Sequence, residues 1–511
     1  MKINQRKVGS ILSYAQMGIS IILSILYTPV MLRLLGQSEY GLYSTVTSTI
    51  SMISILNLGF NSGYIRYYSK YKKNNDKESI YKLNGLFLTI FIIIGIIALL
   101  CGLFLSFNLD LVFKDGLTPD QYVTAKILML LLTFNLAISF PMSVFGNIIF
   151  SHEKFVFSKL IGIGKTVFGP LTNIILLLSG HGSVAMVIAS VTIALIVDAI
   201  YLYYVLKVLK QKFVLGMPEK GLFASLFSYT IFIALNSVID QINWNIDKLV
   251  ITRFHGTEMT AVYSVGYSLY HYFQMFSTAI SGVFSPAIHR IVNETKENVE
   301  KMKASLSEVF TRVGRVQFII LALIVSGVFF FGKPFIHFWA GGGYEDSYIV
   351  ALLLMVPATV PLIQNLGIEI QRAQNIHQFR SIIYAVMAAI NLMLSIILCQ
   401  KYGAVGSAVG TSISLVLANG IIMNVYYQKR CHIDILGFWK SILRLSLGAI
   451  IPIAVGCLIV RFFNLYNIYV LVASIVLYTL VYVASMWLLG MNAYEKDLVR
   501  QPLKKIFRKQ R

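Results

Sequence analysis

The sequence predicts an all-α polytopic membrane protein with about fourteen transmembrane helices. Of its 511 residues, 57% are hydrophobic and 13% are charged, whereas soluble proteins carry roughly 25% charged residues. The apolar residues form long runs such as Val8–Leu32, Leu83–Leu109 and Phe462–Tyr494, which contain no Asp, Glu, Lys or Arg. A run of about 25 residues makes about 38 Å of helix, more than the roughly 30 Å hydrocarbon core. Barrel strands would instead be short and alternate in polarity.

The apolar runs and the charged segments between them set the expected spans. The basic start Met1–Lys7 precedes a run too long for a signal-peptide core, so we expect the first span to remain as an anchor. In chain order, the spans are expected near 8–32, 40–65, 83–107, 127–150, 155–178, 183–206, 222–247, 259–286, 316–332, 347–368, 380–399, 404–427, 443–460 and 468–489.

The net charge of +21 is explained by topology better than by nucleic-acid binding. With an even number of spans, the large basic clusters all fall on one side, which the positive-inside rule assigns to the cytoplasm together with both termini. These clusters are Arg66–Lys82, Lys207–Lys220, Arg290–Arg315, Lys429–Arg444 and Lys496–Arg511. The expected location is therefore the bacterial cytoplasmic (inner) membrane.

The chain contains an internal repeat. VMLRLLGQSEYGLYS (30–44) resembles VITRFHGTEMTAVYS (250–264) at an offset of 220, matching Arg33 with Arg253 and Gly36 with Gly256. HGSVAMVIAS (181–190) resembles YGAVGSAVGT (402–411) at nearly the same offset. Six spans separate the copies, so the repeats have parallel orientation. The prediction is two six-helix bundles, 1–210 and 221–430, followed by two further helices and a basic cytoplasmic tail, 431–511.

Polar side chains inside the expected seventh span form one helical stripe. Asn236, Asp240, Asn243 and Asp247 follow at spacings of four, three and four. A charge at mid-bilayer costs about 2.5–3.5 kcal/mol, so it normally faces water or a partner. Asp247 is also compatible with the outer interface, where charge is cheap. We expect Asp240 to line a wet cavity together with Asn236 and Asn243.

Other polar residues extend this expected cavity. The eighth span carries an aromatic row at helical spacing, which fits either an interfacial belt or a wall for sugar rings. Lys165 lies about 15 Å into the fifth span, and Asp198 lies in the sixth; a structural ion pair and a functional site are equally compatible with them. The full set of candidate cavity residues is Lys165, Arg33, Arg253, Asn236, Asp240, Asn243, Tyr263, Tyr267, Tyr270 and Gln274.

Enzyme and metal motifs are missing from the sequence. The eight histidines form no HxxxH or HExxH pair, and the four cysteines lie at no metal-ligand spacing. The GIGKT segment at 162–166 lies inside a span and lacks the upstream glycine spacing of a phosphate loop. We therefore expect no catalytic residue, no metal site, no disulfide and no cofactor.

Several segments resemble the polysaccharide-transporter branch of the multidrug/oligosaccharidyl-lipid/polysaccharide exporter superfamily, above all O-antigen-unit flippases of the Wzx type. They are LRLLGQSEYGLYS (32–44), LNLGFNSGYIRYYSKY (56–71), DKLVITRFHG (247–256) and YGAVGSAVGTSIS (402–414). The resemblance implies a MATE-like fold with a central cavity open alternately to each side. It implies transport of an oligosaccharide on undecaprenyl pyrophosphate, with membrane lipid and polysaccharide assembly proteins as partners. It also suggests H⁺ or Na⁺ coupling.

The expected function is thus a flippase for surface polysaccharide biosynthesis. In this interpretation Lys165, Arg33 and Arg253 are cationic partners for pyrophosphate, and Asp240 or Asp198 carries the coupling cation. One alternative is a multidrug/cation antiporter of the same superfamily, whose cavity should be acidic or apolar. Another is a polytopic polysaccharide-modifying enzyme, which would be expected to show a large external loop or an embedded histidine.

Overall fold

The computed structural model describes residues 4–114, 116–216, 221–376 and 378–508. Within these ranges the regular secondary structure is helical, without a strand. Nine described helices are long and apolar enough to cross a membrane, or ten if the bent pair α10 (Ser347–Ile363) and α11 (Leu366–Ala373) is one span. The all-helical, multi-pass fold is confirmed, whereas the count of fourteen spans is not.

The chain packs as two compact units, Met1–Val262 with Cys399–Ala404, and Tyr263–Leu398 with Val405–Arg511. The first unit holds α1 (Gln5–Ile53), α2 (Phe60–Lys73), α3 (Lys77–Phe107), α4 (Leu109–Phe113), α5 (Pro119–Ser151), α6 (Phe155–Leu178), α7 (Ser183–Tyr203) and the start of α8 (Leu222–Glu294). The second holds the rest of α8, α9 (Val299–Ala340), α10, α11, most of α12 (Gln378–Leu415), α13 (Met423–Lys429), α14 (Ile435–Ser446), α15 (Ile450–Phe462), α16 (Ile468–Ser485) and α17 (Ala493–Arg508). Packing defines these units, so the predicted division at 210, 221 and 430 stays a prediction.

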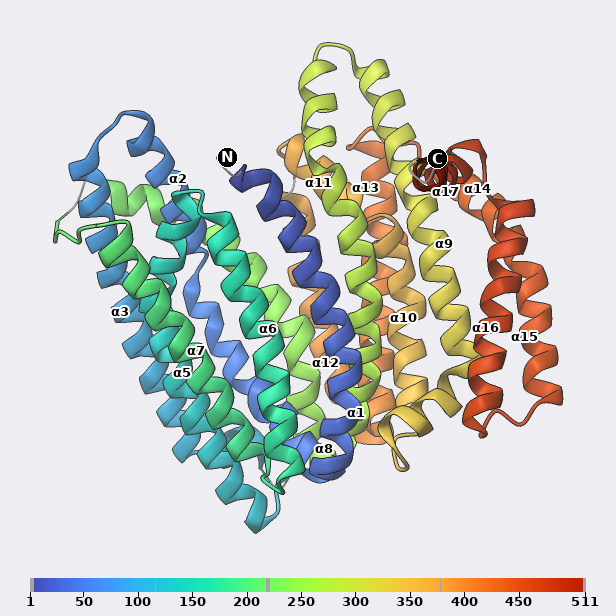
Figure 1. Ribbon diagram of the computed structural model, residues 1–511, viewed down its shortest axis with the longest axis horizontal. Helices are drawn as coiled ribbons and strands as arrows, with labels where there is room; N and C mark the ends of the chain where they lie inside the picture. Colours follow the sequence, from blue (N-terminus) through green and yellow to red (C-terminus); the bar gives the residue numbers. More distant parts are fainter. Residues whose placement is uncertain (1–3, 115, 217–220, 377, 509–511) are drawn as a thin grey trace. The chain divides into compact units, whose positions relative to one another are not determined.

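Sharp breaks divide three long helices. Two of these helices, α1 and α12, each lie in one counted helix where the sequence predicts two spans, whereas α8 is not among the nine described helices that meet the criteria. Gly36 in α1, Gly256 in α8 and Gly403 in α12 all have positive φ. Each break separates two predicted spans with a single glycine instead of a loop. Helix continues directly on both sides of that glycine. In Figure 1, α1 descends to its break and the lighter blue chain then rises toward α2.

The backbone repeats the same unusual geometry in both halves of the sequence. Gly36 has φ 76° and ψ 171°, and Gly256, 220 residues later, has φ 79° and ψ −176°. Such angles lie in a region that is essentially restricted to glycine. The helix-ending turns repeat at an offset of 222. Left-handed Glu153 corresponds to Asn375, and left-handed Lys210 corresponds to His432.

The packing around the glycines repeats as well. A Cβ on Gly182 would lie 2.6 Å from Glu39 Oε1, and a Cβ on Gly403 would lie 3.3 Å from Met259 Sδ. Glu39 and Met259 each lie three residues after a broken-helix glycine, at an offset of 220. The chemistry differs, because the Glu39 carboxylate accepts the N–H of Ser183 at the start of α7 (2.6 Å). The two halves therefore share a backbone plan but not the side chains that fill it.

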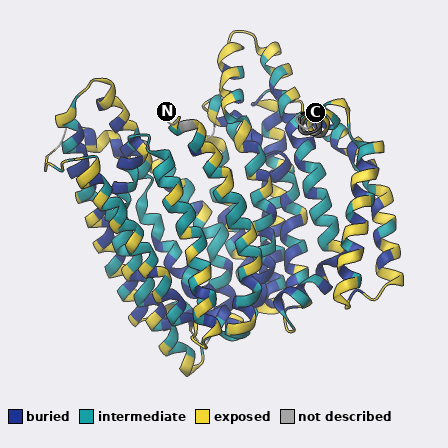
Figure 2. Ribbon diagram, viewed as in Figure 1, coloured by how far each residue is buried: buried dark blue, intermediate teal, exposed yellow. Residues whose placement is uncertain are grey.

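Large apolar side chains are exposed along the outer helices, as expected for lipid-facing surfaces. Leu100 on α3 is 61% exposed and Leu480 on α16 is 63% exposed. Figure 2 shows yellow exposed residues recurring along α15 and α16. In water such a surface would be unfavourable by roughly 25 cal/mol per Å², whereas in a bilayer it needs no protein cover.

An aromatic and polar core joins α2, α3 and the segment after α7 in the first unit. Tyr64 is fully buried against Phe87, with ring centroids 5.2 Å apart. Its hydroxyl donates to Asn84 Oδ1 (2.7 Å), and Asn84 Nδ2 donates to the carbonyl of Lys212 (3.1 Å). A buried amide left unpaired would be costly, so this chain of bonds fixes the 209–214 segment against α3.

A buried ion pair fastens the C-terminal helix to the second unit. Arg315 on α9 is 6% exposed and Glu495 on α17 is 3% exposed. The guanidinium donates to both carboxylate oxygens (2.5 and 3.0 Å), to the carbonyl of Ser441 (3.0 Å) and to the carbonyl of Gly490 (3.1 Å). Full hydrogen bonding is the condition under which a buried charge pair is tolerated.

We predict that Glu495→Gln lowers the stability of the purified protein markedly, by roughly 3–5 kcal/mol, because it leaves the Arg315 charge buried without its counterion. Thermal unfolding in detergent measures this change. Glu308→Gln is the matched control, because the Glu308–Arg312 pair is largely exposed and should contribute about 0–1 kcal/mol. Equal unfolding temperatures for the two variants would contradict the prediction.

Candidate functional site

The candidate cavity residues are distributed over both compact units. Arg33, Lys165, Asp198, Arg253 and the α8 stripe lie in the first unit. The row Tyr263, Tyr267, Tyr270 and Gln274 lies in the second. Each group is therefore described within its own unit, and their assembly into one cavity stays a prediction.

Lys165 occupies an exposed position in the middle of α6. It lies ten residues after Phe155, which corresponds to about 15 Å of helix. Its charge acts on Asp198 of α7, yet within the described residues no salt bridge joins the two side chains. Beside it, Gln16 of α1 donates to Thr166 Oγ1 (3.5 Å). The first unit thus presents a polar strip on its α1–α6 face.

A second polar contact on the same helices lies deeper in the first unit. Asn173 Nδ2 donates to Tyr27 Oη on α1 and to Ser190 Oγ on α7, both at 3.3 Å. This contact ties three helices together close to Pro170, which interrupts the hydrogen bonding of α6. Sequence reasoning missed this contact, because the partners of Asn173 come from other helices.

The predicted polar stripe of α8 is separate from the polar residues that anchor this helix. Gln241 Nε2 donates to Ser54 Oγ (3.4 Å), and Asn245 Nδ2 donates to Gln241 Oε1 (2.6 Å). At about 100° per residue, these two side chains lie about 100° and 140° around the helix from Asp240. Asp240 is exposed, and Asn236 and Asn243 are half-buried. A cavity role for the stripe stays a prediction.

The tyrosine row forms a chain of aromatic contacts on the second part of α8, in which Tyr263 and His271 stack on Tyr267 and Tyr270 meets it edge to face. The ring centroids of Tyr263 and Tyr267 are 6.3 Å apart, those of Tyr267 and Tyr270 are 5.8 Å apart, and His271 stacks on Tyr267 at 6.3 Å. Tyr263 and Tyr270 are buried, at 2% and 3% exposed, whereas Tyr267 and Gln274 are half-buried. Tyr267 and Gln274 are therefore the members of the row best placed to meet a ligand.

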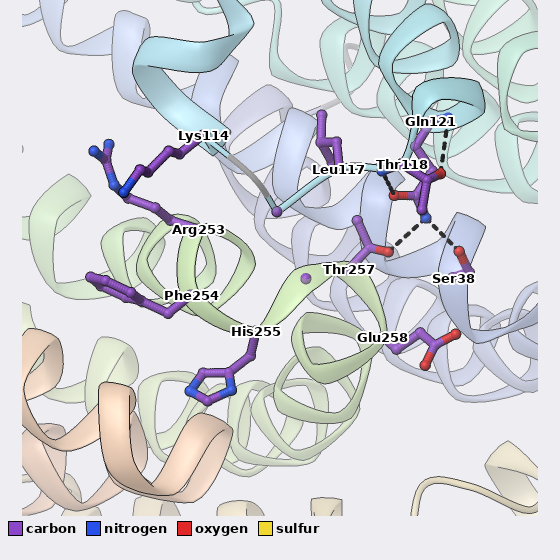
Figure 3. Close-up of a pocket in the computed structure, with 12 residues that line it drawn as sticks. Ser38, Lys114, Leu117, Thr118, Gln121, Arg253, Phe254, His255, Thr257 and Glu258 are labelled. Carbon is purple, nitrogen blue, oxygen red and sulfur yellow. Dashed lines mark hydrogen bonds between the residues drawn. The ribbon is translucent and has the colours of Figure 1, made fainter.

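A pocket of about 750 Å³ lies at the broken-helix end of the first unit. Figure 3 shows Arg253 and Lys114 at one side, with Thr118, Gln121, Ser38 and Thr257 at the other. Arg253 Nη1 donates to the carbonyl of Leu111 (2.9 Å), which holds this cation beside the pocket. Sequence reasoning had selected Arg253 but not Lys114.

Gln121 connects the two repeated helix breaks, and sequence reasoning missed it. Its amide nitrogen donates to Ser38 Oγ (2.6 Å) and to Thr257 Oγ1 (2.9 Å), just after Gly36 and Gly256. Its oxygen accepts the N–H of Thr118 (3.0 Å) in a capping box. The Thr118–Pro119–Asp120–Gln121 segment is a recognisable helix start, but the capping pattern does not reveal the bonds to other helices.

Close packing reinforces this junction. A Cβ on Gly41 would lie 1.8 Å from the carbonyl oxygen of Thr257, so the two helices approach as only glycine allows. Thr252 Oγ1 lies 2.7 Å from both Thr45 Oγ1 and Thr260 Oγ1, and all three hydroxyls are buried. The junction between the repeated breaks is therefore tightly packed and hydrogen-bonded.

The fold is similar to that of solved membrane transporters. The structure of the lipid II flippase MurJ in an inward closed conformation matches with a TM-score of 0.70 and 17% identity, over 96% of this chain and 99% of that one. An inward-facing multidrug resistance MATE family transporter of the MOP superfamily matches with a TM-score of 0.65 and 15% identity, over 82% and 96%. At this identity the likeness concerns the fold.

The chain belongs to the polysaccharide biosynthesis protein family, whose sequence model matches residues 7–292, more than half of its length. A Shigella flexneri protein named as an O-antigen transporter is 21% identical over 85% of this chain and 99% of its own length. An uncharacterised membrane protein of Methanocaldococcus jannaschii is 22% identical over 73% and 74%. The resemblance predicted from the sequence is confirmed, and so is the assignment to transporters rather than enzymes.

We predict that Gly36→Ala destabilises the protein by about 1–3 kcal/mol, because an alanine is strained at φ 76° and ψ 171°. Space is not the cause, since nothing lies within 4 Å of a Cβ at this position. Gly18→Ala on the same helix also meets nothing within 4 Å and has ordinary φ, so it should be neutral or slightly stabilising. Thermal unfolding of both variants separates backbone strain from packing. Equal changes in unfolding temperature for the two variants would contradict the prediction.

Proposed function

We propose that the protein is a flippase that moves an undecaprenyl-pyrophosphate-linked oligosaccharide repeat unit across the cytoplasmic membrane by alternating access. The observation that carries the proposal is the exposed Lys165 in the middle of α6, beside Gln16, Thr166 and Asp198. An ammonium group facing lipid at this depth would cost about 2.5–3.5 kcal/mol. A face that carries it is therefore best explained as the wall of a water-filled space.

The chemistry of the substrate explains why such a space is needed. A sugar hydroxyl transferred to alkane without a partner costs about 4–8 kcal/mol, so an oligosaccharide needs a polar route while its lipid tail stays in the bilayer. The pyrophosphate requires cationic partners. Lys165, Arg33 and Arg253 are the proposed ones, and all three are exposed in the first unit. The aromatic faces of the Tyr267 row suit sugar rings.

Alternating access requires at least one junction that can open. The repeated breaks at Gly36 and Gly256, joined by Gln121, have the features of such a junction on the predicted external side. Coupling to H⁺ or Na⁺ is proposed for Asp240 or Asp198, because a unit charge crossing 100 mV supplies about 2.3 kcal/mol. Both termini are proposed to be cytoplasmic.

A multidrug/cation antiporter is the second candidate, and the fold likeness to MATE transporters is the observation in its favour. The exposed cations argue against it, because Lys165 and Arg253 would repel cationic drugs. A polysaccharide-modifying enzyme is not supported, since the family and the relatives with named functions belong to transport and polysaccharide biosynthesis.

We predict that depletion of the protein in its native host causes lipid-linked oligosaccharide to accumulate on the inner leaflet. The leaflet is measured by accessibility of the glycan to a membrane-impermeant lectin or glycosidase in intact spheroplasts and in inverted vesicles. Re-expression should return the glycan to the outer face. Accumulation on the outer leaflet, or an unchanged distribution with altered drug sensitivity, would contradict the flippase proposal.

We predict that Lys165→Gln reduces transport by roughly tenfold or more, because a charged hydrogen bond to the pyrophosphate is lost. Lys165→Arg should retain most activity. Lys159→Gln is the matched control, since it removes the same charge near the start of α6. The exchange Lys165→Asp with Asp198→Lys distinguishes the remaining possibility: restored transport would mean that the two residues form a structural pair.

A further inference from the structure

A second basic pocket lies at the other end of the first unit, apart from the proposed substrate route. It has a volume of about 360 Å³ and is formed where the α2–α3 turn, the end of α5 and the segment after α7 meet. The residues on which its chemistry depends are Tyr68, Lys72, Asn75, Lys77, His152 and Lys210. Three of these six side chains are cationic, and none of the residues lining the pocket is acidic.

The cations are held by the fold rather than scattered along it. Lys72 Nζ donates to the carbonyl of Ser151 at the end of α5 (3.2 Å) and lies 5.8 Å from the centroid of the Tyr68 ring. Lys210 and Asn75 both have left-handed backbone conformations, with φ 50° and 54°. Left-handed geometry is uncommon for a side chain as long as lysine. The strained turns bring cations from separate elements to one place.

The floor of the pocket is a hydrogen-bonded pair, the buried Tyr68 and the half-buried His152. Tyr68 is 3% exposed. His152 Nδ1 donates to the carbonyl of Ile148 (2.9 Å), which leaves Nε2 to accept the Tyr68 hydroxyl (3.2 Å). Burial lowers the pKa of His152, and the charges of Lys72 and Lys154 lower it further, against the bond to Ile148, which raises it. The imidazole is therefore neutral at pH 7, and the positive charge of the pocket comes from lysines.

The second half of the sequence provides an internal comparison. The hydrogen bonds from Leu209 N and Gln211 N recur 222 residues later at Cys431 N and Ile433 N. Cys431 and Ile433 are fully buried, whereas Leu209 and Gln211 are half-buried. Gln374 is the counterpart of His152. It donates to the carbonyl of Cys431 (3.4 Å) and so ties the turn at Asn375 to the turn at His432. The turn is thus buried by its own side chains in the second half of the sequence. In the first half the same backbone turn leaves a pocket lined by lysines.

The pocket lies at the ends of candidate membrane spans, where lipid headgroups are expected. Lys77 begins α3, the most apolar of the candidate spans, and the pocket residues Lys72 and His152 lie at the ends of α2 and α5. Lys and Tyr side chains at span ends are typical of the interface. Basic pockets between membrane helices suit phosphate headgroups. A free phosphate would offer the same anion, but the half-buried aromatic and apolar walls Tyr81 and Leu209 favour a lipid.

We propose that this pocket binds the phosphate group of an anionic phospholipid of the surrounding membrane. Lys72, Lys77 and Lys210 neutralise the phosphodiester, and Asn75 supplies an amide donor. The acyl chains remain in the bilayer beside α3. The proposal does not rest on the flippase function, because lipid binding is measured without transport.

The test uses the full-length purified protein titrated with phosphatidylglycerol or phosphatidylcholine in mixed micelles, with thermal unfolding and native mass spectrometry as readouts. Phosphatidylglycerol should raise the unfolding temperature and stay bound as a discrete adduct, and phosphatidylcholine should do neither. The variant K72Q/K210Q should need roughly tenfold more phosphatidylglycerol for the same shift. K72R/K210R, which keeps the charge, should respond like the wild type.

The control is K73Q/K207Q, which removes two charges from neighbouring positions outside the pocket. An equal loss of response in this control would mean that net charge alone attracts the lipid, and would overturn the proposal. Inorganic phosphate is the third arm. If phosphate alone reproduces the stabilisation, the site binds a free anion and the lipid assignment is wrong.

Discussion

A charge withdrawn from bulk water needs a counterion, hydrogen-bond partners or a hydrated surface, and this constraint governs the two cations on which the account of the protein depends. Arg315 satisfies it with Glu495 and backbone carbonyls, so its charge is locked into the packing of the second unit. Lys165 has neither a salt bridge nor a hydrogen bond among the described residues, although its charge interacts electrostatically with Asp198. These two cations are thus accommodated in opposite ways. One contributes to structure, and the other defines a polar surface.

The repeated glycines show how continuous helices change direction at corresponding positions of the sequence. Gly36 and Gly256 have nearly identical backbone angles in a region that other residues avoid. The helix changes direction at each of these glycines without an intervening loop. Gln121 then joins the two breaks through one side-chain amide. Backbone conformation therefore supplies the geometry, and polar side chains decide how firmly the junction is held.

The turns that recur at an offset of 222 share their backbone but not their chemistry. The turn around Lys210 recurs around His432 with the same hydrogen bonds, yet buried Cys431 and Ile433 close the second copy. Glu39 and Met259 differ in the same way where they pack on Gly182 and Gly403. Once a backbone hydrogen-bond pattern is satisfied, its side chains are free to diverge. This freedom lets one half of the protein carry polar sites that the other half lacks.

Long uncharged runs determined the helical membrane fold by themselves, because lipid tolerates only backbones that satisfy their own hydrogen bonds. The match of Gly36 with Gly256, the family resemblance and the depth of Lys165 were also readable from the sequence. Gln121, Lys114 and the Tyr68–His152 floor were not. The partners of Gln121 on other helices and the partner of Tyr68 lie more than eighty residues away. Lys114 lies with Arg253 only at a pocket that packing creates. Tertiary structure also decided that Tyr263 and Tyr270 are buried, because helical spacing defines a face but not what covers it.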